Sequence, residues 1–414
     1  MDHTLDLHAV RAQFPGLSRS LSDQTCAFFD GPAGSQTPQR VVDAVCHYLQ
    51  HTNANHGAPF CTSRESDELL DRAHHRLAEF LGAENGECIA FGANMTTLTF
   101  ALSRTLARTW NPGDEIIVTQ LDHDANVTPW VTAAAEAGAV VHHLGVDFDD
   151  CTLRMDEFQS LLNPRTRLLA VGLASNATGT INPVAEMTRQ AHAVGALVFA
   201  DAVHFAPHRL IDFQALGVDL LACSAYKFFG PHLGILCGRQ ELLQQLTPDK
   251  LRPASDDLPD KWMTGTQNHE GIAGTAAAVD YLASLASNAI PTTQPRAVLQ
   301  SAFDAIQSHE HQLLEQLLAG LAELPELRVW GITDVQRLED RVPTISCTWP
   351  QHNPQRLSEQ LAAEGLYVWA GNHYALPFTE AAGLEPDGTL RVGLLHYNTA
   401  AEVDRLLRAL GNLA

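Results

Sequence analysis

The chain has 414 residues, enough for two domains, and 45% of them are hydrophobic against 18% charged, which is ordinary for a globular protein. Its 48 acidic and 26 basic side chains give a formal net charge of −22, so nucleic acid and anionic membranes are not expected as partners. The chain has no run of 18 apolar residues, and residues 1–14 lack the basic and apolar regions of a secretory signal. We therefore expect a cytoplasmic protein without a membrane span, whose eight scattered cysteines are reduced thiols.

Between about residues 86 and 240, short apolar runs alternate with helical or polar segments. The runs are Ile116–Thr119, Val140–Leu144, Leu168–Leu173, Leu197–Ala200 and Leu220–Cys223. Some of them are apolar throughout, as strands buried on both faces are. The alternation predicts a mostly parallel sheet with helices on both faces. Gly195 is expected to end the helix that precedes the strand running to Asp201.

The pattern changes after a long polar stretch at 247–268. The elements expected beyond it are an Ala-rich helix at 271–286, an amphipathic helix at 300–323, strands at 342–349 and 389–396, and a last helix opened by a capping box from Thr399 to Glu402. We place a domain boundary near 286. This divides the chain into a large domain at 22–286 and a smaller α+β domain at 287–414, which the N-terminal segment 1–21 joins.

A lysine and an aspartate stand at the ends of two predicted strands. Lys227 follows the strand that ends at Ser224 and lies between aromatic neighbours, where partial burial lowers the pKa of an amine, as a Schiff-base lysine requires. Asp201 ends a buried strand, the place where α/β folds bind ligands, and a carboxylate there suits the ring nitrogen of a pyridinium cofactor. Taken singly, a snorkelling lysine and a helix-capping aspartate explain these residues as well.

Two further segments follow strands. His123 is placed to stack on an aromatic cofactor, although a core or surface histidine is the commoner explanation for any one of 20 histidines. The turn from Phe91 to Thr97 offers backbone N–H groups and a helix dipole to a phosphate, without the lysine or glycines of a standard nucleotide loop. His204 and His208 have metal-ligand spacing, but Pro207 lies between them and no third ligand is apparent, so no metal is expected.

The order of these features resembles that of the class V aminotransferases, in particular their cysteine desulfurase-like branch. The segments that carry the resemblance are Phe29–Pro38, Gly113–Ile117, His123–Trp130, Ser175–Pro183, Gly265–Asn268 and Leu390–Thr399. The resemblance implies pyridoxal 5′-phosphate (PLP) as cofactor and a homodimer. It also implies fold type I, in which helices sandwich a mostly parallel seven-stranded sheet and a smaller α+β domain follows.

The resemblance further implies a role for each matching residue. Lys227 would hold PLP as a Schiff base and then act as acid and base, Asp201 would pair with the pyridine nitrogen, and His123 would stack on the ring. Arg391 would bind the carboxylate of the substrate through two hydrogen bonds. The other cofactor contacts would come from Met95, Thr96, Asn176, His204 (a glutamine in the family), Ser224, Tyr226 (usually a histidine) and Thr266 of a second subunit.

The segment from Val368 to Pro377 departs from the family. Desulfurases of the closest group carry their persulfide-forming cysteine in this loop, but the aligned residue here is Tyr374, and Trp369 takes the place of a preceding basic residue. A tyrosine forms no persulfide, so Tyr374 is expected either to donate a proton or to pack over the cofactor. Cys61 is expected to be an ordinary buried thiol rather than a group at the site entrance.

The sequence therefore predicts a PLP-dependent lyase or transferase that acts on an α-amino acid or amino-acid conjugate through a Cα carbanion, with C–S (β) elimination favoured. Aminotransfer and epimerisation share the carbanion and remain alternatives. A true cysteine desulfurase that uses another thiol is a third alternative. A catalytically silent PLP-binding partner protein is a fourth, against which the intact Lys227 and Arg391 argue.

Overall fold

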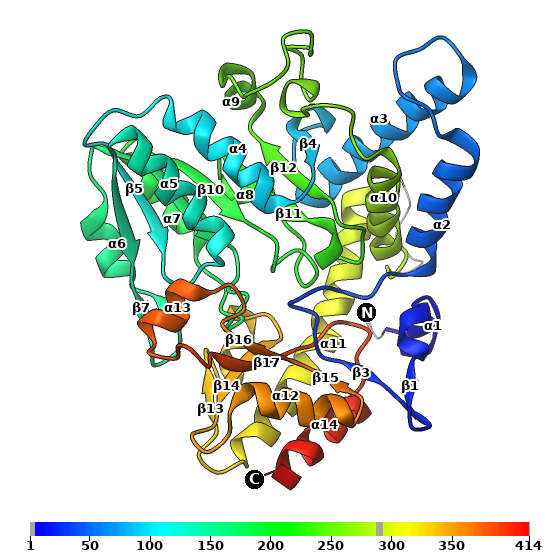
Figure 1. Cartoon of the computed structure of the whole chain (residues 1–414), viewed down its shortest axis with the longest axis vertical. Coiled ribbons are helices and arrows are strands. Elements are labelled where there is room, and N and C mark those ends of the chain that lie inside the picture. The colour runs from blue at the N-terminus through cyan, green and yellow to red at the C-terminus, as the bar shows by residue number, and fades with distance from the viewer. Residues whose placement is uncertain (1–4, 287–292, 414) are drawn as a thin grey trace.

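The computed structural model describes residues 5–286 and 293–413, in which a seven-stranded sheet is the largest element (Figure 1). In spatial order its strands are β4 (Ile89–Gly92), β12 (Gly234–Gly238), β11 (Leu220–Ser224), β10 (Leu197–Asp201), β9 (Thr166–Gly172), β5 (Glu115–Thr119) and β6 (Val140–Leu144). All five predicted strands belong to this sheet and run parallel. Strand β12 was not predicted, because it has no long apolar run. It is antiparallel to both of its neighbours. The predicted mostly parallel seven-stranded sheet is confirmed.

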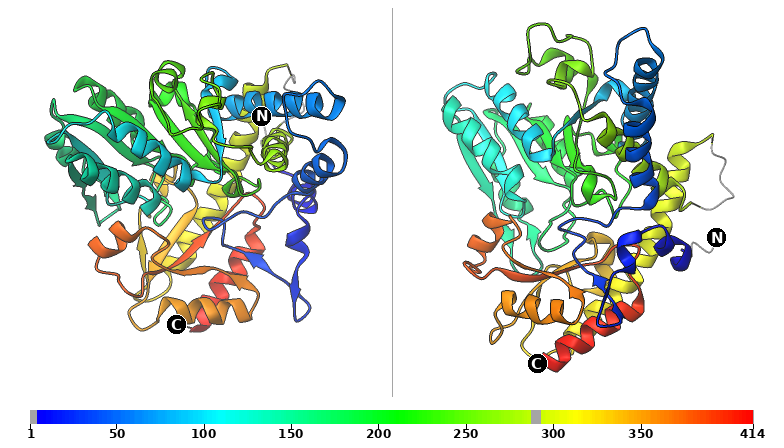
Figure 2. Two further views of the ribbon diagram at one scale, coloured as in Figure 1. Left: turned by 45° about the horizontal axis from the view of Figure 1, so that its top comes forward. Right: turned by 45° about the vertical axis from the view of Figure 1, so that its right-hand side comes forward.

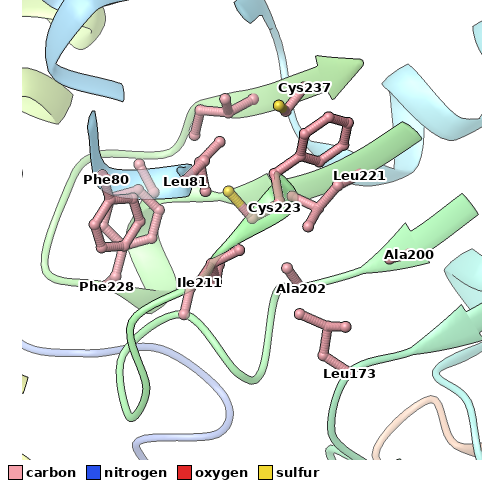
Figure 3. Packing of buried hydrophobic residues seen from close by; sticks show 14 of the residues in the cluster. Phe80, Leu81, Leu173, Ala200, Ala202, Ile211, Leu221, Cys223, Phe228 and Cys237 are labelled. Atoms are coloured by element: carbon pink, nitrogen blue, oxygen red, sulfur yellow. The ribbon is translucent and has the colours of Figure 1, made fainter. Parts of the chain in front are cut away.

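Helices cover both faces of this sheet, which explains why its strands are apolar throughout. Consecutive residues point to opposite faces of a strand, and Leu168 and Leu169 of β9 accordingly join two different hydrophobic clusters. One cluster includes α3 (Cys61–Leu81), α7 (Val184–Ala193) and α10 (His269–Ala283); the other includes α4 (Met95–Ala107) and α5 (Thr128–Ala137). Figure 3 shows part of the first cluster, where the ring of Phe80 packs on that of Phe228 with centroids 4.8 Å apart.

Local signals in the sequence set several helix ends. Gly195 has φ +83° and its N–H donates to the carbonyl of His192 in the last turn of α7, so the predicted stop is confirmed. The predicted capping box is also present at the start of α14 (Ala400–Leu413). There the Thr399 N–H donates to Glu402 Oε2 at 3.0 Å and the Glu402 N–H donates to Thr399 Oγ1 at 3.2 Å.

A second, four-stranded sheet is formed by the C-terminal part of the chain. Its spatial order is β13 (Arg328–Trp330), β14 (Thr344–Thr348), β17 (Thr389–Gly393) and β16 (Trp369–Gly371), and it packs with α11 (Pro295–Ala322), α12 (Pro354–Ala363) and α14. Close to it, β3 (Ala27–Phe28) pairs in parallel with β15 (Leu366–Tyr367), so the N-terminal segment that contacts this sheet extends beyond residue 21. The predicted boundary near 286 adjoins residues 287–292, which lie outside the described residues.

The remaining elements are shorter. They are α1 (Leu7–Ala12), β1 (Ser20–Leu21), β2 (Gln24–Thr25), α2 (Gln39–His47), β7 (Val146–Asp147), β8 (Thr152–Leu153), α6 (Met155–Leu161), α8 (Phe213–Leu216), α9 (Gln240–Gln245) and α13 (Leu376–Ala381). In the part of the chain that the structure describes, no helix has the length and apolar character needed to cross a membrane.

The two sheets meet where the parallel strands of the larger one end. In each view of Figures 1 and 2 the C-terminal segments, coloured orange to red, gather on one side of the large sheet. Contacts join the two parts there: Arg391 of β17 donates to the carbonyl of Asn176, which follows β9, and the Asp124 N–H after β5 donates to the carbonyl of Tyr374. Open α/β sheets place their ligand sites at this edge.

Candidate active site

A cavity that encloses about 520 Å³ of empty space lies at the carboxyl ends of the parallel strands. Nine of the predicted site residues line it, namely Met95, Thr96, His123, Asn176, Asp201, His204, Ser224, Tyr226 and Lys227. They come from four strand ends and one helix start, so only the folded sheet brings them together.

Lys227 projects into the cavity from the turn after β11. Its Nζ donates to the carbonyl of Pro32 and, at 3.0 Å, to the carbonyl of Ala33. Burial, together with the charge of the neighbouring Arg391, lowers the pKa of the amine to about 7, whereas Asp201 and Asp30 oppose the shift. A lysine that is largely neutral near pH 7 is a competent nucleophile and base.

Two buried carboxyl groups face the cavity from the ends of β10 and β5, the two strands that flank β9. Asp201 ends β10, and its Oδ1 accepts a hydrogen bond from the Val203 N–H at 2.8 Å; burial raises its pKa to about 6. Asp122, which follows β5, accepts from Thr119 Oγ1 at 2.6 Å and from Asn126 Nδ2 at 3.3 Å. Burial raises the pKa of Asp122 to about 7, and the negative charge of Asp201 raises it too. A cationic group in the cavity would relieve the cost of ionising Asp201.

The sequence analysis missed Asp122, although it directly precedes His123. It also did not explain why residue 172, the last residue of β9, is a glycine. A Cβ atom at Gly172 would lie 2.5 Å from Asp122 Oδ1. The close approach of the β9 backbone therefore requires a glycine, and the glycine in turn allows a carboxyl group to be buried beside Asp201.

His123 stands between the cavity and the solvent. Its Nδ1 accepts from the Ala125 N–H at 3.0 Å, which fixes the orientation of the ring. Burial, together with the charges of Lys227 and Arg391, lowers its pKa to about 4, so the imidazole is neutral at neutral pH. A neutral flat ring in this place suits stacking on an aromatic ligand.

The polar walls contain atoms that need a ligand partner. Asn176 Oδ1 and His204 Nε2 are buried without a hydrogen-bond partner among the described residues. Such atoms are costly unless a ligand or water satisfies them. The ring of His204 also packs edge-on against His208, 5.5 Å between centroids, and His208 Nδ1 lies 2.9 Å from Glu310 Oε2.

One end of the cavity is built for an anion. The N-terminus of α4 opens onto it, and the Met95 N–H donates to Ser224 Oγ at 3.0 Å. Thr96 is exposed in the first turn of α4, and Tyr226 stacks on His232 with centroids 4.8 Å apart. A helix start beside several hydroxyl groups favours a phosphate.

Arg391 lies beyond the residues that line the cavity, on strand β17 of the smaller sheet. Its Nη1 donates to the Asn176 carbonyl at 2.9 Å, and its Nε is buried without a partner in the described part of the chain. Burial lowers the pKa of the guanidinium to about 9 while Asp30 opposes that shift, so Arg391 stays cationic at neutral pH. Burial raises the pKa of Asp30 to about 6. The sequence analysis gave Asp30 no role.

Tyr374 lies at the mouth of the site rather than inside it. The side chain is 73% exposed, and its ring stacks on His123 with centroids 5.6 Å apart and planes 19° apart. The same loop reaches the cavity wall through His373, whose carbonyl accepts from Asn176 Nδ2 at 2.8 Å.

Thr266 is the one predicted cofactor contact that stands apart. It is exposed in the loop before α10 and lines a larger and more open cleft, of about 2310 Å³ of empty space, between that loop, α3 and α10. Within one chain, therefore, Thr266 is not part of the cavity that Lys227 lines.

The prediction for Cys61 was wrong. Cys61 is the first residue of α3. It is exposed because this first turn of the helix faces away from the core. All eight cysteines lie within the described residues, and none is among those that line the cavity.

The sequence matches the family "Aminotransferase class-V" over residues 27–406. A cysteine desulfurase of Dickeya dadantii is 32% identical over 416 residues, which cover 97% of this chain and 95% of the relative. A cysteine desulfurase of Synechococcus elongatus is also 32% identical over 423 residues and 98% of this chain, but the match spans only 63% of the relative's length.

The fold has solved counterparts as well. The apo structure of a cysteine desulfurase from Thermococcus onnurineus NA1 superposes with a TM-score of 0.87 at 25% sequence identity. The superposition covers 99% of this chain and 98% of that one. The predicted fold type I arrangement is thereby confirmed.

Proposed function

The chain belongs to the aminotransferase class-V family of PLP-dependent enzymes, and from this premise we propose that it is a lyase that acts on an α-amino acid or amino-acid conjugate by C–S (β) elimination. The enzyme would work as a homodimer in the cytoplasm. One observation carries the reaction type: the loop that would have to present a thiol presents the exposed phenol of Tyr374.

The residues of the cavity fit PLP. Asp201 offers a buried carboxylate for a cationic ring nitrogen, His123 a neutral ring, and the start of α4 with Ser224 an anion site. The unpaired Asn176 Oδ1 and His204 Nε2 leave polar capacity for the ring substituents. When bound, PLP supplies an electron-accepting ring that stabilises negative charge on the substrate's α-carbon.

Lys227 would hold the cofactor and then carry a proton to and from the substrate's α-carbon. A pKa of about 7 allows the amine to exist in both protonation states near neutral pH, which is what a group that both takes and returns a proton requires. The carbonyls of Pro32 and Ala33 orient the amine before the cofactor binds.

Arg391 would bind the substrate's α-carboxylate. Its buried Nε has no partner in the described part of the chain, and a planar guanidinium matches a carboxylate at two points. The carbonyl of Asn176 holds Nη1, so the guanidinium is oriented before a substrate arrives.

Tyr374 would act at the far end of the substrate. A phenol is protonated at neutral pH and is a poor nucleophile towards sulfur, but it can donate a proton or a hydrogen bond to a leaving group. With no cysteine among the residues that line the cavity, cleavage of a C–S bond by elimination requires no thiolate from this chain.

The test is a product assay with L-cysteine and with S-substituted cysteines. We expect pyruvate, ammonia and a free thiol from the S-substituted substrates, and negligible alanine or protein persulfide from L-cysteine. Tyr374→Phe should slow elimination by about tenfold to a hundredfold if the phenol donates the proton, the lower end of what acid catalysis contributes. Rapid release of alanine with persulfide on the wild-type protein would overturn the proposal.

A true cysteine desulfurase is the second candidate, because the curated relatives at 32% identity carry that name. This candidate requires another thiol, and Cys61 is one of only two exposed cysteines among the described residues. Persulfide labelling of the wild type and of Cys61→Ser decides between them: label that disappears in the variant favours the desulfurase. Cys46→Ser, which removes the other exposed thiol, is the matched control.

Aminotransfer and epimerisation would use the same Lys227 and Arg391. Keto-acid acceptors or loss of optical activity, followed in the same assays, would identify them. A protein that binds PLP without turnover would show no spectral change with any amino acid; the oriented and unpaired Arg391 argues against this outcome.

A further inference from the structure

Two large aromatic side chains stand exposed at the mouth of the site. Trp369 is 52% exposed and Tyr374 is 73% exposed, although both belong to the same short stretch of chain that runs past Arg391. Exposed tryptophan and tyrosine rings side by side with a binding site are unusual unless a ligand covers them. We call Trp369 and Tyr374 together the aromatic rim.

Strand pairing places Trp369 beside the carboxylate-binding group. In the antiparallel pair of β16 and β17, Trp369 lies directly opposite Arg391. Residues directly opposite each other project to the same face of a sheet with Cβ atoms about 5 Å apart. Arg391 uses that face to reach Asn176, so the indole lies on the site-facing side, whereas the next residue, Ala370, pairs with Leu390 on the core face.

The backbone holds Tyr374 in place at a cost. Both His373 and Tyr374 have a positive φ, +58° and +56°, which is a backbone conformation that residues other than glycine rarely adopt. Hydrogen bonds enforce it, since the two carbonyls accept from Asn176 Nδ2 at 2.8 Å and from the Asp124 N–H at 2.7 Å. Backbone strain of this kind gathers at functional sites.

Further hydrogen bonds hold the backbone from which the Tyr374 ring projects. Asn372 Oδ1 accepts from the Tyr374 N–H at 3.1 Å, and His373 Nε2 lies 3.0 Å from Thr389 Oγ1 of β17. The Tyr374 ring lies nearly parallel to His123, 19° between planes. Tyr374 therefore extends, towards the solvent, the stack that begins in the cavity.

From this arrangement we propose that the aromatic rim selects a substrate whose side-chain sulfur carries a flat aromatic ring. The inference rests on the proposed function, because it takes Arg391 as the carboxylate site and Lys227 as the amine-binding group. Flat rings gain from stacked or edge-on contact beyond the burial of area, and two rigid rings lose little conformational freedom when they bind one. A thiol or methyl side chain would leave both rings exposed.

Charge argues for a neutral ring. Trp369 and Tyr374 would also attract a cation through their ring faces, but a cationic side chain would lie beside Arg391, which stays positively charged at neutral pH. Repulsion from Arg391 thus disfavours a cationic side chain at this mouth.

The experiment titrates the PLP-bound enzyme with L-phenylalanine, L-cyclohexylalanine and L-alanine and follows the cofactor absorbance to obtain Kd. The first two ligands have the same carbon skeleton but differ in flatness. We expect phenylalanine to bind about tenfold more tightly than alanine and about threefold more tightly than cyclohexylalanine, within the range of aromatic contacts.

Variants locate the preference. Trp369→Ala and Tyr374→Ala should each weaken phenylalanine binding about threefold to tenfold and change alanine binding less than twofold. Tyr374→Phe keeps the ring and should keep the affinity, which separates the ring from the hydroxyl. Val140→Ala, an exposed apolar residue on the edge strand β6, is the control that should change neither ligand.

Two results would overturn the inference. One is equal affinity of the enzyme for phenylalanine and cyclohexylalanine. The other is an equal loss of phenylalanine and alanine binding in the rim variants. Either result would show that the rim does not select flat rings. In both cases the response to alanine would leave the proposed function standing. No spectral response to any amino acid would instead end both.

Discussion

The cavity around Lys227 and the aromatic rim at its mouth are neighbours built on different principles. The cavity takes its residues from the ends of buried strands, and burial shifts the pKa of nearly every ionisable group in it, including Lys227, Asp201 and His123. The rim consists of exposed side chains on a short strand and a strained turn, held by backbone hydrogen bonds.

The difference indicates a division of labour. A cavity set into the sheet can hold one cofactor in one orientation, because its walls cannot move without disturbing the core. A rim on loops of the smaller sheet can change its side chains without disturbing that core. Under the proposed function, common chemistry would reside in the cavity, and the choice of substrate and of the step after α-carbon deprotonation would reside in the rim.

Replacing Lys227 is the most severe way to separate the two regions. Lys227→Ala should abolish the covalent cofactor adduct and lower turnover by at least about a thousandfold, because both the attachment and the proton transfer use this amine. Borohydride reduction and mass spectrometry test the assignment cleanly, since the chain has only three lysines. Lys250→Ala is the control; PLP found on Lys250 or Lys261 would remove Lys227 from its role.

Arg391→Lys tests the boundary between cavity and rim. The guanidinium binds a carboxylate at two points and an ammonium does not, so KM should rise by the equivalent of about 1.5–3 kcal/mol, the range of a hydrogen bond to a charged group. The Kd for PLP should not change, because Arg391 is not among the residues that line the cavity. Unchanged steady-state kinetics would place the substrate carboxylate elsewhere.

Asp122→Asn tests whether burial raises the pKa of a carboxyl group in the cavity in the absence of cofactor. The pKa of Asp122 is raised from 3.8 to about 7, so its contribution to stability is fully present below about pH 4 and is lost as pH rises through about 7. From pH 5 to pH 8 the apo wild type should lose on the order of 2 kcal/mol of unfolding free energy relative to the variant.

Urea titrations of the two apo proteins at several pH values measure this difference. Asp124→Asn is the matched control, because Asp124 lies two residues along the chain, outside the cavity, and accepts a hydrogen bond from Thr128. Parallel pH profiles for wild type and Asp122→Asn would mean that the cavity does not suppress the charge of Asp122.

The sequence predicted the cavity better than the rim, for a physical reason. Apolar runs identify parallel strands, strand ends meet at one edge, and polar residues at those ends must therefore converge; Asp201, Ser224 and His123 followed this rule. Asp122 was missed because its burial depends on Gly172 of another strand, which no local pattern reveals.

Local sequence patterns could not predict the aromatic rim either. That Trp369 lies opposite Arg391 depends on the register of two strands more than twenty residues apart in the sequence. The exposure of Cys61 depends on which face of α3 the core covers, and the default expectation of an ordinary buried thiol was wrong. Strand β12 escaped because it is short and bounded by glycines at Gly234 and Gly238.

Thr266 supplies the last and smallest test, which asks whether the cavity is complete within one chain. The loop that carries Thr266 lines a separate open cleft, so its predicted contact with phosphate requires a second subunit. Loss of one hydrogen bond to a phosphate in Thr266→Ala should speed PLP release several-fold, about 1 kcal/mol. Thr264→Ala, in the same exposed loop, should not.

Mixed dimers then decide where Thr266 acts. If Thr266 reaches across, a dimer of one Lys227→Ala subunit and one Thr266→Ala subunit contains one site with both defects and one site with neither. Half of the PLP should therefore be released as slowly as from wild type. If Thr266 acts within its own chain, each site carries one defect, no slow fraction appears, and a homodimer with shared sites is ruled out. The slow fraction thus reports directly on whether the cavity, unlike the rim, is built from two chains.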